Sequence, residues 1–388
     1  MSAGASIPLE RIMPPRLGSV DPSAFPNEAF DLYSIPAFDQ REPEVLEGSA
    51  IGSVKQIVQP GDVLLSRIVP HIRRAWVVGR GRGRRIIASG EWIVFRGAAV
   101  EPRYLRHVLV SDPFHAEFMS TVSGVGGSLL RARPAYVAKI KIPLPPLPKQ
   151  RRIAEILDKA DALRAKRRAA LAQLDTLTQS IFLDMFGDPA TNPKRWAVRT
   201  VGDMLDSAAY GTSEKSAATG MTPVLRMSNI TSTGRIDLAD LKFMDLSERE
   251  HERYTVRLGD VLFNRTNSAE LVGKTAIFRE TRSMAFAGYL IRLRVTGNNH
   301  PEYLAGFMNT RYAKRVLRGM CKSIIGMANI NATEVQAMRI AFPPLALQRQ
   351  FADRVALVEI SRVAQLAGLA ELESLFSSVQ HRAFRGEL

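Results

Sequence analysis

The side chains best suited to chemistry in this chain are basic and gather in one short stretch. Seven arginines and one histidine fall between residues 67 and 85, where the run GRGRGRR is expected to form a basic hairpin. A guanidinium group can hold a phosphate and can fork onto the edge of a guanine. We therefore predict that nucleic acid is contacted by Arg67, His71, Arg73, Arg74, Arg82, Arg84 and Arg85. The alternative for any one of them is a solvated surface charge.

A second basic region lies in the C-terminal half of the chain. It contains Arg265, Lys274 and Arg282, together with asparagines whose amide groups can read an adenine edge. Loops ahead of two proline-containing segments add Arg131 in the first half and Lys322 in the second. The candidate DNA-binding residues outside the first cluster are therefore Arg131, Asn264, Arg265, Asn267, Lys274, Arg282, Lys322, Asn329 and Asn331.

The sequence lacks the motifs that a nuclease, methyltransferase or ATPase would need. The tripeptide GKT at residues 273–275 resembles the end of a phosphate-binding loop, but Ser268 stands where that loop requires glycine. Adenine methyltransferases hold the flipped base with a tetrapeptide in which Asp or Asn precedes Pro-Pro-aromatic. This tetrapeptide does not occur in the chain. The six histidines show no metal-ligand spacing, and Cys321 is interpreted as a small buried side chain. We predict no catalytic residue, metal or cofactor in this chain.

The overall composition points to a polyanionic partner. The net charge is +15 and the sequence pI is about 10.2, whereas hydrophobic and charged fractions of 46% and 23% are ordinary for a soluble protein. Such a charge attracts nucleic acid or an acidic membrane surface. No stretch approaches the roughly 18 apolar residues of a membrane span. Asp21 and Glu28 interrupt the N-terminal segment, which argues against a signal peptide. A single cysteine suits a reducing compartment, so we expect a cytoplasmic protein without membrane contact.

The elements that must position the basic side chains occur twice. GDVLLSR at residues 61–67 returns as GDVLFNR at 259–265, and PPLPKQRRIA at 145–154 returns as PPLALQRQFA at 343–352. Both pairs are separated by 198 residues, so two distant landmarks keep one register. The chain is therefore interpreted as a tandem duplication, in which each copy is a globular block followed by a long helix.

Each globular block is expected to mix strands with short helices. Strand-like runs rich in β-branched and aromatic residues are DLYSIP, VLLSR, AWVVG and WIVF in the first copy, and PVLRM, VLFNR, KTAIF and YLIRLRV in the second. Helices are expected at residues 102–111 and 301–310, each with proline at its first position. Glycine-bearing loops follow at 123–128 and 323–331. The predicted fold class is α+β.

A long segment without proline closes each copy. Apolar residues recur there at three- and four-residue steps, a pattern typical of a helix that needs a partner. We expect the two helices to pair as an antiparallel coiled coil; the alternative is that each lies on its own globular block. The predicted seam consists of Ile153, Ile156, Ala160, Leu163, Leu174, Leu177, Ile181, Phe351, Val355, Val358, Leu366, Leu369 and Leu372.

Over nearly its whole length, this chain resembles the specificity subunit of a type I restriction–modification system. The resemblance rests on the proline-headed helices at 143–157 and 343–355, on the repeated GDVL motif, and on FGDP and WAVRTVGDML within 186–205. The first copy departs from the family at its start, where SIPLERI stands without a counterpart of Trp196. The resemblance implies two mixed α/β target recognition domains that alternate with the two long helices. We place them at 1–147 and 189–344, with the helices at 148–188 and 345–388.

The resemblance also implies what the chain does and which partners carry the chemistry. Each domain would read one half of a bipartite, asymmetric site in double-stranded DNA. The helices would dock two modification subunits, which methylate adenine with S-adenosylmethionine, and two restriction subunits that use ATP and Mg can join the complex. The chain itself would be non-catalytic. The alternative is a coiled-coil scaffold, or a stand-alone DNA-binding protein, without a methyltransferase partner.

Overall fold

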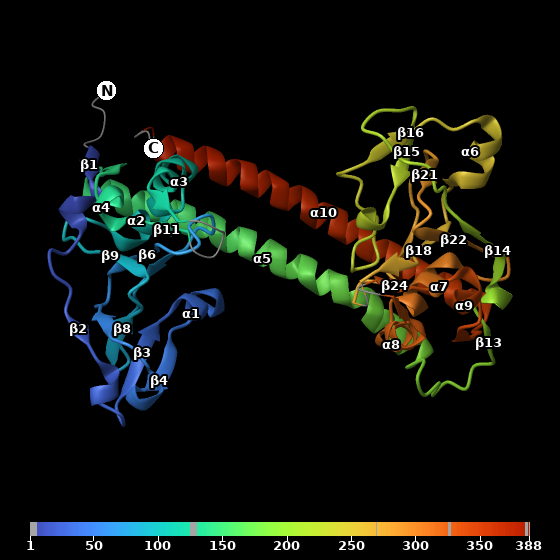
Figure 1. Ribbon diagram of the computed structural model, residues 1–388, viewed down its shortest axis with the longest axis horizontal. Helices are drawn as coiled ribbons and strands as arrows, with labels where there is room; N and C mark the ends of the chain where they lie inside the picture. The colour runs from blue at the N-terminus through green and yellow to red at the C-terminus, as the bar shows by residue number, and fades with distance from the viewer. Residues whose placement is uncertain (1–5, 125–129, 269, 325–326, 385–386, 388) are drawn as a thin grey trace. The chain divides into compact units, whose positions relative to one another are not determined.

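The computed structural model describes residues 6–124, 130–268, 270–324, 327–384 and 387. It divides into two compact units, of which the first contains Met1–Arg167 with Gly368–Leu388 and the second contains Arg168–Ala367. Each unit holds one globular block and the adjoining halves of two 40-residue helices, α5 (Leu147–Phe186) and α10 (Leu345–Phe384), drawn in green and red in Figure 1. The compact units therefore cut across the four predicted segments, because each half-helix packs with the block that it touches.

The first globular block is built on two sheets, of order β2-β5-β8-β3-β4 and β7-β6-β9. β8 runs parallel to β3, whereas the other neighbours are antiparallel. A separate pair, β1 with β12, joins the two ends of the block. The elements are β1 (Ser6–Pro8), β2 (Ser19–Val20), β3 (Ala29–Tyr33), α1 (Ile35–Gln40), β4 (Glu44–Glu47), β5 (Lys55–Ile57), β6 (Val63–Ser66), β7 (Ala75–Val77), β8 (Arg85–Ala88), β9 (Trp92–Phe95), α2 (Pro102–Leu109), α3 (Asp112–Ser120), β10 (Val122–Ser123), β11 (Arg131–Ala132), α4 (Pro134–Val137) and β12 (Lys141–Pro143).

The basic hairpin predicted at residues 79–85 is wrong. β7 pairs with β6, whereas β8, which begins at Arg85, pairs with β3 and β5 in the other sheet. The backbone groups of β8 are already used by these two ladders, so the basic segment is a crossover between sheets. The predicted strand DLYSIP also ends early, because Ser34 caps α1 by accepting a hydrogen bond from the Ala37 N–H at 3.0 Å.

The second block repeats the mixture with different strand pairings. Its sheets have the orders β14-β22-β18-β20, β16-β15-β21-β17 and β19-β24-β23, and the pair β13 with β25 corresponds to β1 with β12. The elements are β13 (Val198–Thr200), β14 (Leu205–Tyr210), β15 (Thr222–Leu225), β16 (Lys242–Met244), α6 (Glu248–Tyr254), β17 (Thr255–Val256), β18 (Val261–Asn264), β19 (Thr266–Asn267), β20 (Thr275–Ile277), β21 (Met284–Phe286), β22 (Leu290–Val295), α7 (Pro301–Met308), α8 (Arg311–Met320), β23 (Lys322–Ile324), β24 (Met327–Asn329), α9 (Ala332–Gln336) and β25 (Arg339–Ala341). The two predicted glycine-bearing loops lie partly outside the described residues.

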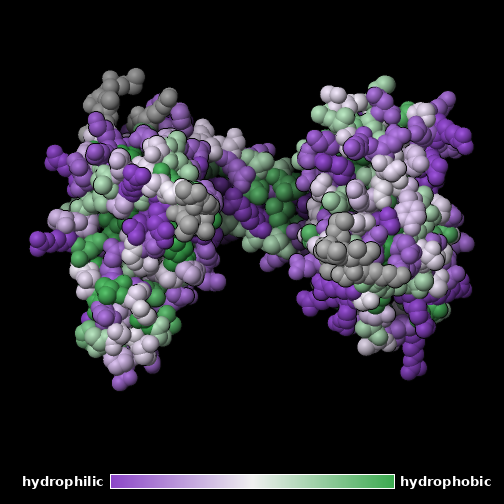
Figure 2. Space-filling view, viewed as in Figure 1, coloured by the Kyte–Doolittle hydropathy of each residue, from purple (hydrophilic) through white to green (hydrophobic). Residues whose placement is uncertain are grey.

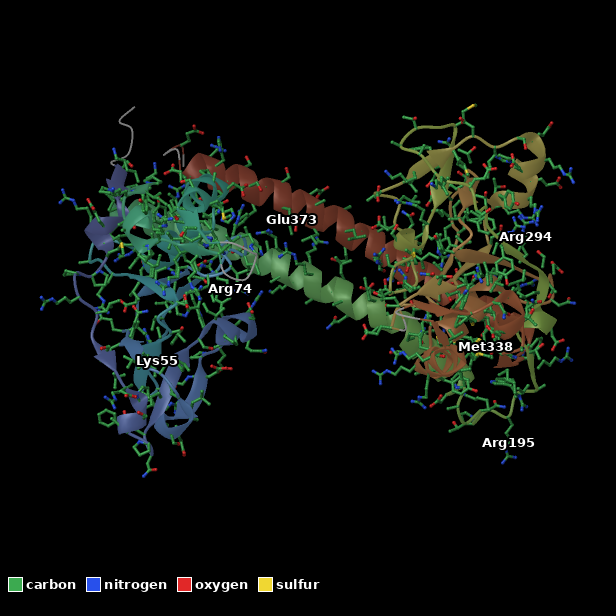
Figure 3. All side chains as sticks on the ribbon, in the orientation of Figure 1. Lys55, Arg74, Arg195, Arg294, Met338 and Glu373 are labelled. Carbon is green, nitrogen blue, oxygen red and sulfur yellow. The ribbon has the colours of Figure 1, made fainter. Side chains whose placement is uncertain are left out.

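The repeated GDVL motif places a buried aspartate at the same point of both blocks. Asp62 binds the Arg96 guanidinium through hydrogen bonds of 2.6 and 2.7 Å, and Asp260 binds Arg294 (labelled in Figure 3) through bonds of 2.9 and 3.2 Å. Each carboxylate also accepts a bond of 2.9 Å from the backbone N–H three residues before it. A buried carboxylate is costly unless it is paired, so the motif and its arginine must occur together.

A tyrosine and a glutamine tie each block to the start of its long helix. Tyr104 and Tyr303 donate from their hydroxyls to the carbonyls of the paired strands β12 and β25, at 2.9 and 2.8 Å. Gln150 in α5 and Gln348 in α10 each accept from a backbone N–H of the block and donate to the proline carbonyl five residues earlier. Burial raises the pKa of both tyrosines, which keeps them protonated as donors. With the aspartate–arginine pairs, these residues form the shared frame of the two blocks.

The long helices take part in the core of each unit. In the first unit, Ile153 and Leu157 of α5 and Phe376 of α10 belong to one buried cluster. In the second unit, Phe182 of α5 and Phe351 of α10 belong to another, and their ring centroids lie 5.6 Å apart. No helix in the described ranges is both long enough and apolar enough to span a membrane.

The predicted seam between the helices is interrupted. Leu163, Leu177 and Leu366 are exposed, by 50%, 40% and 41%, so these three residues do not form the seam predicted for them. Charged side chains make contacts near them instead, including an ion pair of 3.6 Å between Arg362 and Asp175. Of the other predicted seam residues, four are buried, namely Ile153, Phe351, Val355 and Val358, and six are half-buried, namely Ile156, Ala160, Leu174, Ile181, Leu369 and Leu372.

Candidate nucleic-acid interface

The arginines at the start of β8 bind carboxylates of the same block. Arg85 makes two hydrogen bonds of 2.5 Å to Glu28, and Arg84 donates to the buried Asp31 at 2.7 Å. Arg82 pairs with the exposed Glu42 at 3.1 Å. A phosphate could reach these guanidinium groups only in competition with carboxylates that already occupy them. The cluster is therefore less positive than its sequence indicates.

Four of the other predicted residues of the first unit are also partnered. Arg67 and Arg131 share Glu91, at 2.9 and 3.3 Å, and their hydrogen bonds lower the pKa of that carboxyl despite its partial burial. Arg74, labelled in Figure 3, is buried and forks onto Asp39 with two bonds of 3.2 Å. Arg73 pairs with Asp112 at 2.6 Å, whereas His71 is exposed. The sequence shows these cations but not the carboxylates that the fold brings beside them.

In the second unit, Arg265 lies over an aromatic ring. Its guanidinium carbon is 4.8 Å from the centroid of Tyr210, whose hydroxyl accepts a hydrogen bond from the Ala332 N–H at 2.8 Å. The Nε atom of Arg265 is buried and has no hydrogen-bond partner among the described residues. The cation–π contact thus orients the group without neutralising its charge.

The predicted asparagines divide between surface and core. Asn329 is exposed on β24 and Asn267 is half-buried on β19, and these strands pair so that both asparagines lie in one ladder. Asn331 is exposed but caps α9, accepting from the Glu334 N–H at 2.8 Å. Asn264 is fully buried, so its amide cannot meet a base edge in this conformation. Asn267 and Asn329 likewise accept hydrogen bonds, from the Ser268 N–H at 2.9 Å and the Thr266 hydroxyl at 3.3 Å, so these two and Asn331 remain predicted base readers, whereas Asn264 does not.

Two of the predicted cations, Lys274 and Arg282, contact backbone carbonyls rather than carboxylates. Lys274 donates from Nζ to the Met227 carbonyl at 3.0 Å, and its partial burial lowers the pKa of that ammonium group. Arg282 similarly donates to the Met221 carbonyl at 3.0 Å. Lys322 belongs to β23, and its side chain lies outside the described part of the chain. Lys274 and Arg282 therefore have no carboxylate partner among the residues that the structure describes.

Sequence reasoning missed four basic residues on α8: Arg311, Lys314, Arg315 and Arg318. The signal was present, because RYAKRVLRGM places arginines at steps of four and three residues, which gather on one helical face. Figure 2 shows many hydrophilic side chains on the visible face of the second unit.

Sequence reasoning also missed the residues that join each block to the long helices. In the first unit, His107 is fully buried on α2 and its Nε2 lies 2.8 Å from Asp158 of α5, which also pairs with Arg106 at 2.9 Å. In the second unit, Arg235 binds Asp175 of α5 at 2.6 Å and Glu359 of α10 at 3.0 Å. The partners are far apart in sequence, so no local sequence motif predicts these contacts.

The second joint lines an open cavity of about 760 Å³. Its wall includes Arg235, Asp175, Glu359 and Arg362, which already neutralise one another through ion pairs. No group of His, Cys, Asp and Glu suited to a metal occurs among the described residues. The ion pairs in its wall link the block to both long helices, so the cavity lies at a structural joint.

Comparison with known proteins gives one family. A family model described as "Type I restriction modification DNA specificity domain" matches residues 111–173 and 193–360, which is more than half of the chain. The type I restriction enzyme EcoKI specificity subunit of Escherichia coli (strain K12) is 26% identical over 318 residues, covering 77% of this chain and 67% of that protein. The StySPI specificity subunit of Salmonella potsdam is 25% identical over 336 residues, covering 80% and 72%.

A solved structure supports the fold. Its subject is the assembly and conformational transition of the type I R-M system, and its chain is 22% identical, with a TM-score of 0.61. The match covers 100% of this chain and 98% of that chain, so both blocks and both long helices have counterparts in one fold.

Proposed function

The chain belongs to the family of type I restriction modification DNA specificity domains, and from this premise we propose that it selects the DNA sequence on which a type I complex acts. Its curated relatives are specificity subunits, which is a non-catalytic role. In this role the chain binds double-stranded DNA and leaves the reaction to its partners. The alternative of a scaffold without DNA has no support from this family.

The proposal of a bipartite site rests on one observation. The shared frame occurs twice, and the surface residues of the two copies differ. Two frames of the same construction suit a site made of two half-sites. The first block pairs arginines with carboxylates such as Glu28 and Glu91, whereas in the described part of the second block Arg265 and Lys274 have none. Different charges and different hydrogen-bonding groups read different bases, so we propose an asymmetric site.

We further propose that α5 and α10 pair in antiparallel fashion and separate the two domains. Contacts inside each unit support this: Arg164 lies 4.3 Å from the Phe376 ring in the first, and Phe182 packs on Phe351 in the second. The early half of each helix thus meets the late half of the other. A 40-residue helix is roughly 60 Å long, so deleting one heptad from both helices should shorten the spacer between half-sites. An unchanged spacer preference would contradict this pairing.

The partners that we propose are two modification subunits, which bring S-adenosylmethionine, and restriction subunits, which bring ATP and Mg. An exposed apolar row on α10, formed by Leu357, Ile360 and Val363 with exposures of 64%, 67% and 63%, supports docking at the helices. Since the partners act on chromosomal DNA, we place the complex in the cytoplasm.

The test is reconstitution with the modification subunit of the same host. Native mass spectrometry should show two modification subunits per chain, and DNA fragments that the complex selects from a random pool should share one gapped motif. Weak binding without a common motif would favour the scaffold alternative, and motif selection by the chain alone would favour a stand-alone DNA-binding protein.

A further inference from the structure

The helix α8 carries an unbalanced charge on one face. Its ten residues include four basic side chains and no acidic one. Ala313 and Leu317 are buried against the core of the second unit, which turns Arg311, Arg315 and Arg318 toward solvent. These three arginines are spaced by four and three residues, so their side chains are neighbours on the helix surface.

No carboxylate pairs with Arg311, Arg315 or Arg318 in the part of the chain that the structure describes. This contrasts with the first unit, where Arg82, Arg84 and Arg85 each have a carboxylate partner. Like charges three and four residues apart destabilise a helix. Water and salt screen that repulsion in part, and an external polyanion would relieve it further.

Two lysines extend this positive face toward the strands. Lys314 donates from Nζ to the Gly273 carbonyl at 2.6 Å, which brings it beside Lys274 on the adjoining segment. Burial, and then the charges of Lys274 and Arg318, lower the pKa of Lys314 to about 8. The lowered pKa thus reflects mainly the burial of the ammonium group and, after it, two neighbouring cations.

We propose that Arg311, Arg315 and Arg318, with Lys274 beside them, bind the phosphate backbone of DNA next to the half-site of the second domain. This proposal rests on the proposed function and deepens it by assigning a backbone contact. From Arg311 to Arg318 the helix rises roughly 10 Å. One DNA strand carries a phosphate about every 3.4 Å along the axis. The face therefore matches about three consecutive phosphates.

The corresponding helix of the first domain cannot make this contact. α3 contains Asp112 and Glu117 and no lysine or arginine. A duplex lying on α3 would meet negative rather than positive charge. The second domain therefore holds the backbone more strongly, and its half-site contributes more of the salt dependence of binding.

The test compares two triple variants of the full chain in complex with its modification subunit. The first carries Arg311→Gln, Arg315→Gln and Arg318→Gln. The matched control removes three exposed arginines elsewhere in the same domain, Arg249→Gln, Arg253→Gln and Arg257→Gln. The measurement is the slope of log affinity against log salt concentration for a duplex containing the recognised site, together with the selected motif.

We expect the α8 variant to lose about 0.9 of slope for each phosphate contact removed, hence roughly two to three in total, with the motif unchanged. The control should keep the wild-type slope. Lysine at the three positions should restore the slope, because a point charge also holds a phosphate. Circular dichroism and the thermal midpoint should show that each variant is folded.

Three results would overturn the inference. If the wild-type complex binds the site and the α8 variant keeps the full slope, the face does not contact phosphate. If the variant instead loses its modification subunit, the face docks an acidic protein surface. If the control loses as much slope as the variant, the effect is one of total charge. Failure of the wild-type complex to select any DNA would be the distinct failure of the proposed function.

Discussion

The two joints between globular block and long helix occupy equivalent places in the duplication but are made of different chemistry. In the first, α2 presents His107 to Asp158 of α5, one turn after the frame residue Tyr104. In the second, α7 presents Gly306 at the same distance from Tyr303, and Phe182 and Phe351 fill the space against it. At these equivalent positions the first unit has a buried polar pair (the polar joint) and the second has an aromatic cluster (the aromatic joint), in addition to the Arg235 ion pairs described above.

The difference between the polar and the aromatic joint shows which features the two copies share. The shared frame fixes the path of the backbone through paired strands and buried hydrogen bonds, so both copies keep it. The side chains packed in each joint have only to fit the long helix that they contact. The same backbone path therefore accommodates a histidine in one copy and a glycine in the other. Predictions can therefore be directed at each joint separately.

The largest effect is expected from Phe351→Ala in the aromatic joint. Phe351 is fully buried against Phe182 and Phe186, and its truncation leaves a cavity that costs about 3–5 kcal/mol. Hydrogen exchange should show faster opening of α7, with α2 in the first unit unchanged. Leu357→Ala, at a position that is 64% exposed, is the control and should change stability by less than about 0.5 kcal/mol. Equal exchange in wild type and variant would contradict the packing described for this joint.

A smaller loss is expected from Gly306→Ala. The added Cβ would lie 2.9 Å from a Phe182 ring atom and 3.0 Å from Phe351, so the rings must shift. Overpacking of this kind costs about 1–3 kcal/mol, offset by a helix-propensity gain of up to about 1 kcal/mol. Gly319→Ala in α8, where a Cβ meets nothing within 4 Å, should stabilise instead. The midpoint of thermal unfolding of both variants measures these effects. A stabilised Gly306→Ala would show that the aromatic joint can accept an extra methyl group without strain.

The polar joint should make stability depend on pH. Burial, followed by the nearby Arg106 charge, lowers the pKa of His107 even though Asp158 and Asp161 face the ring. The unfolded chain therefore takes up a proton at a higher pH than the folded one does. The resulting stability is complete above the unfolded value of about 6.5 and is lost as pH falls below it.

Replacing the histidine isolates this contribution. Chemical denaturation of wild type and His107→Gln between pH 5 and 7.5 should show a steeper fall at low pH in the wild type. His115 and His300 also have lowered pKa values, through burial, but they are common to both proteins and cancel. Parallel curves would mean that folding leaves the pKa of His107 unchanged, and an opposite difference in slope would mean that folding raises it.

The smallest effect is expected from Arg82→Gln in the first block. Its exposed pair with Glu42 contributes at most about 1 kcal/mol to stability. Because Glu42 already compensates this arginine, its loss should change the salt slope of DNA binding less than Arg318→Gln does. A larger slope change for Arg82→Gln would reverse the contrast drawn between the two domains.

Much of the fold followed from matched motifs in the sequence. The 198-residue offset identified both blocks, and the structure shows its cause in the pairs Asp62–Arg96 and Asp260–Arg294. Strand runs such as VLLSR and VLFNR correspond to β6 and β18, because buried β-branched and aromatic residues leave few alternatives. The long helices were visible as segments without proline.

What sequence could not supply is the partner of each charge. Arg84 and Arg85 meet Asp31 and Glu28, which lie 53 and 57 residues earlier, so the cluster looked free until the sheets brought its carboxylates to it. The same limit explains the three exposed leucines of the predicted seam, because Arg362 meets Asp175 across two helices and periodicity alone favoured the leucines. The α8 arginines were accessible to sequence reasoning, since their spacing is local.

The central claim is that this chain selects one bipartite, asymmetric DNA sequence, and the most direct measurement is a genome-wide adenine-methylation map of the host with and without its gene. The account predicts that removing the gene abolishes methylation at one gapped motif and its complement and leaves other motifs unchanged. A motif that persists without the gene, or a lost motif that is symmetric or has no gap, would contradict it.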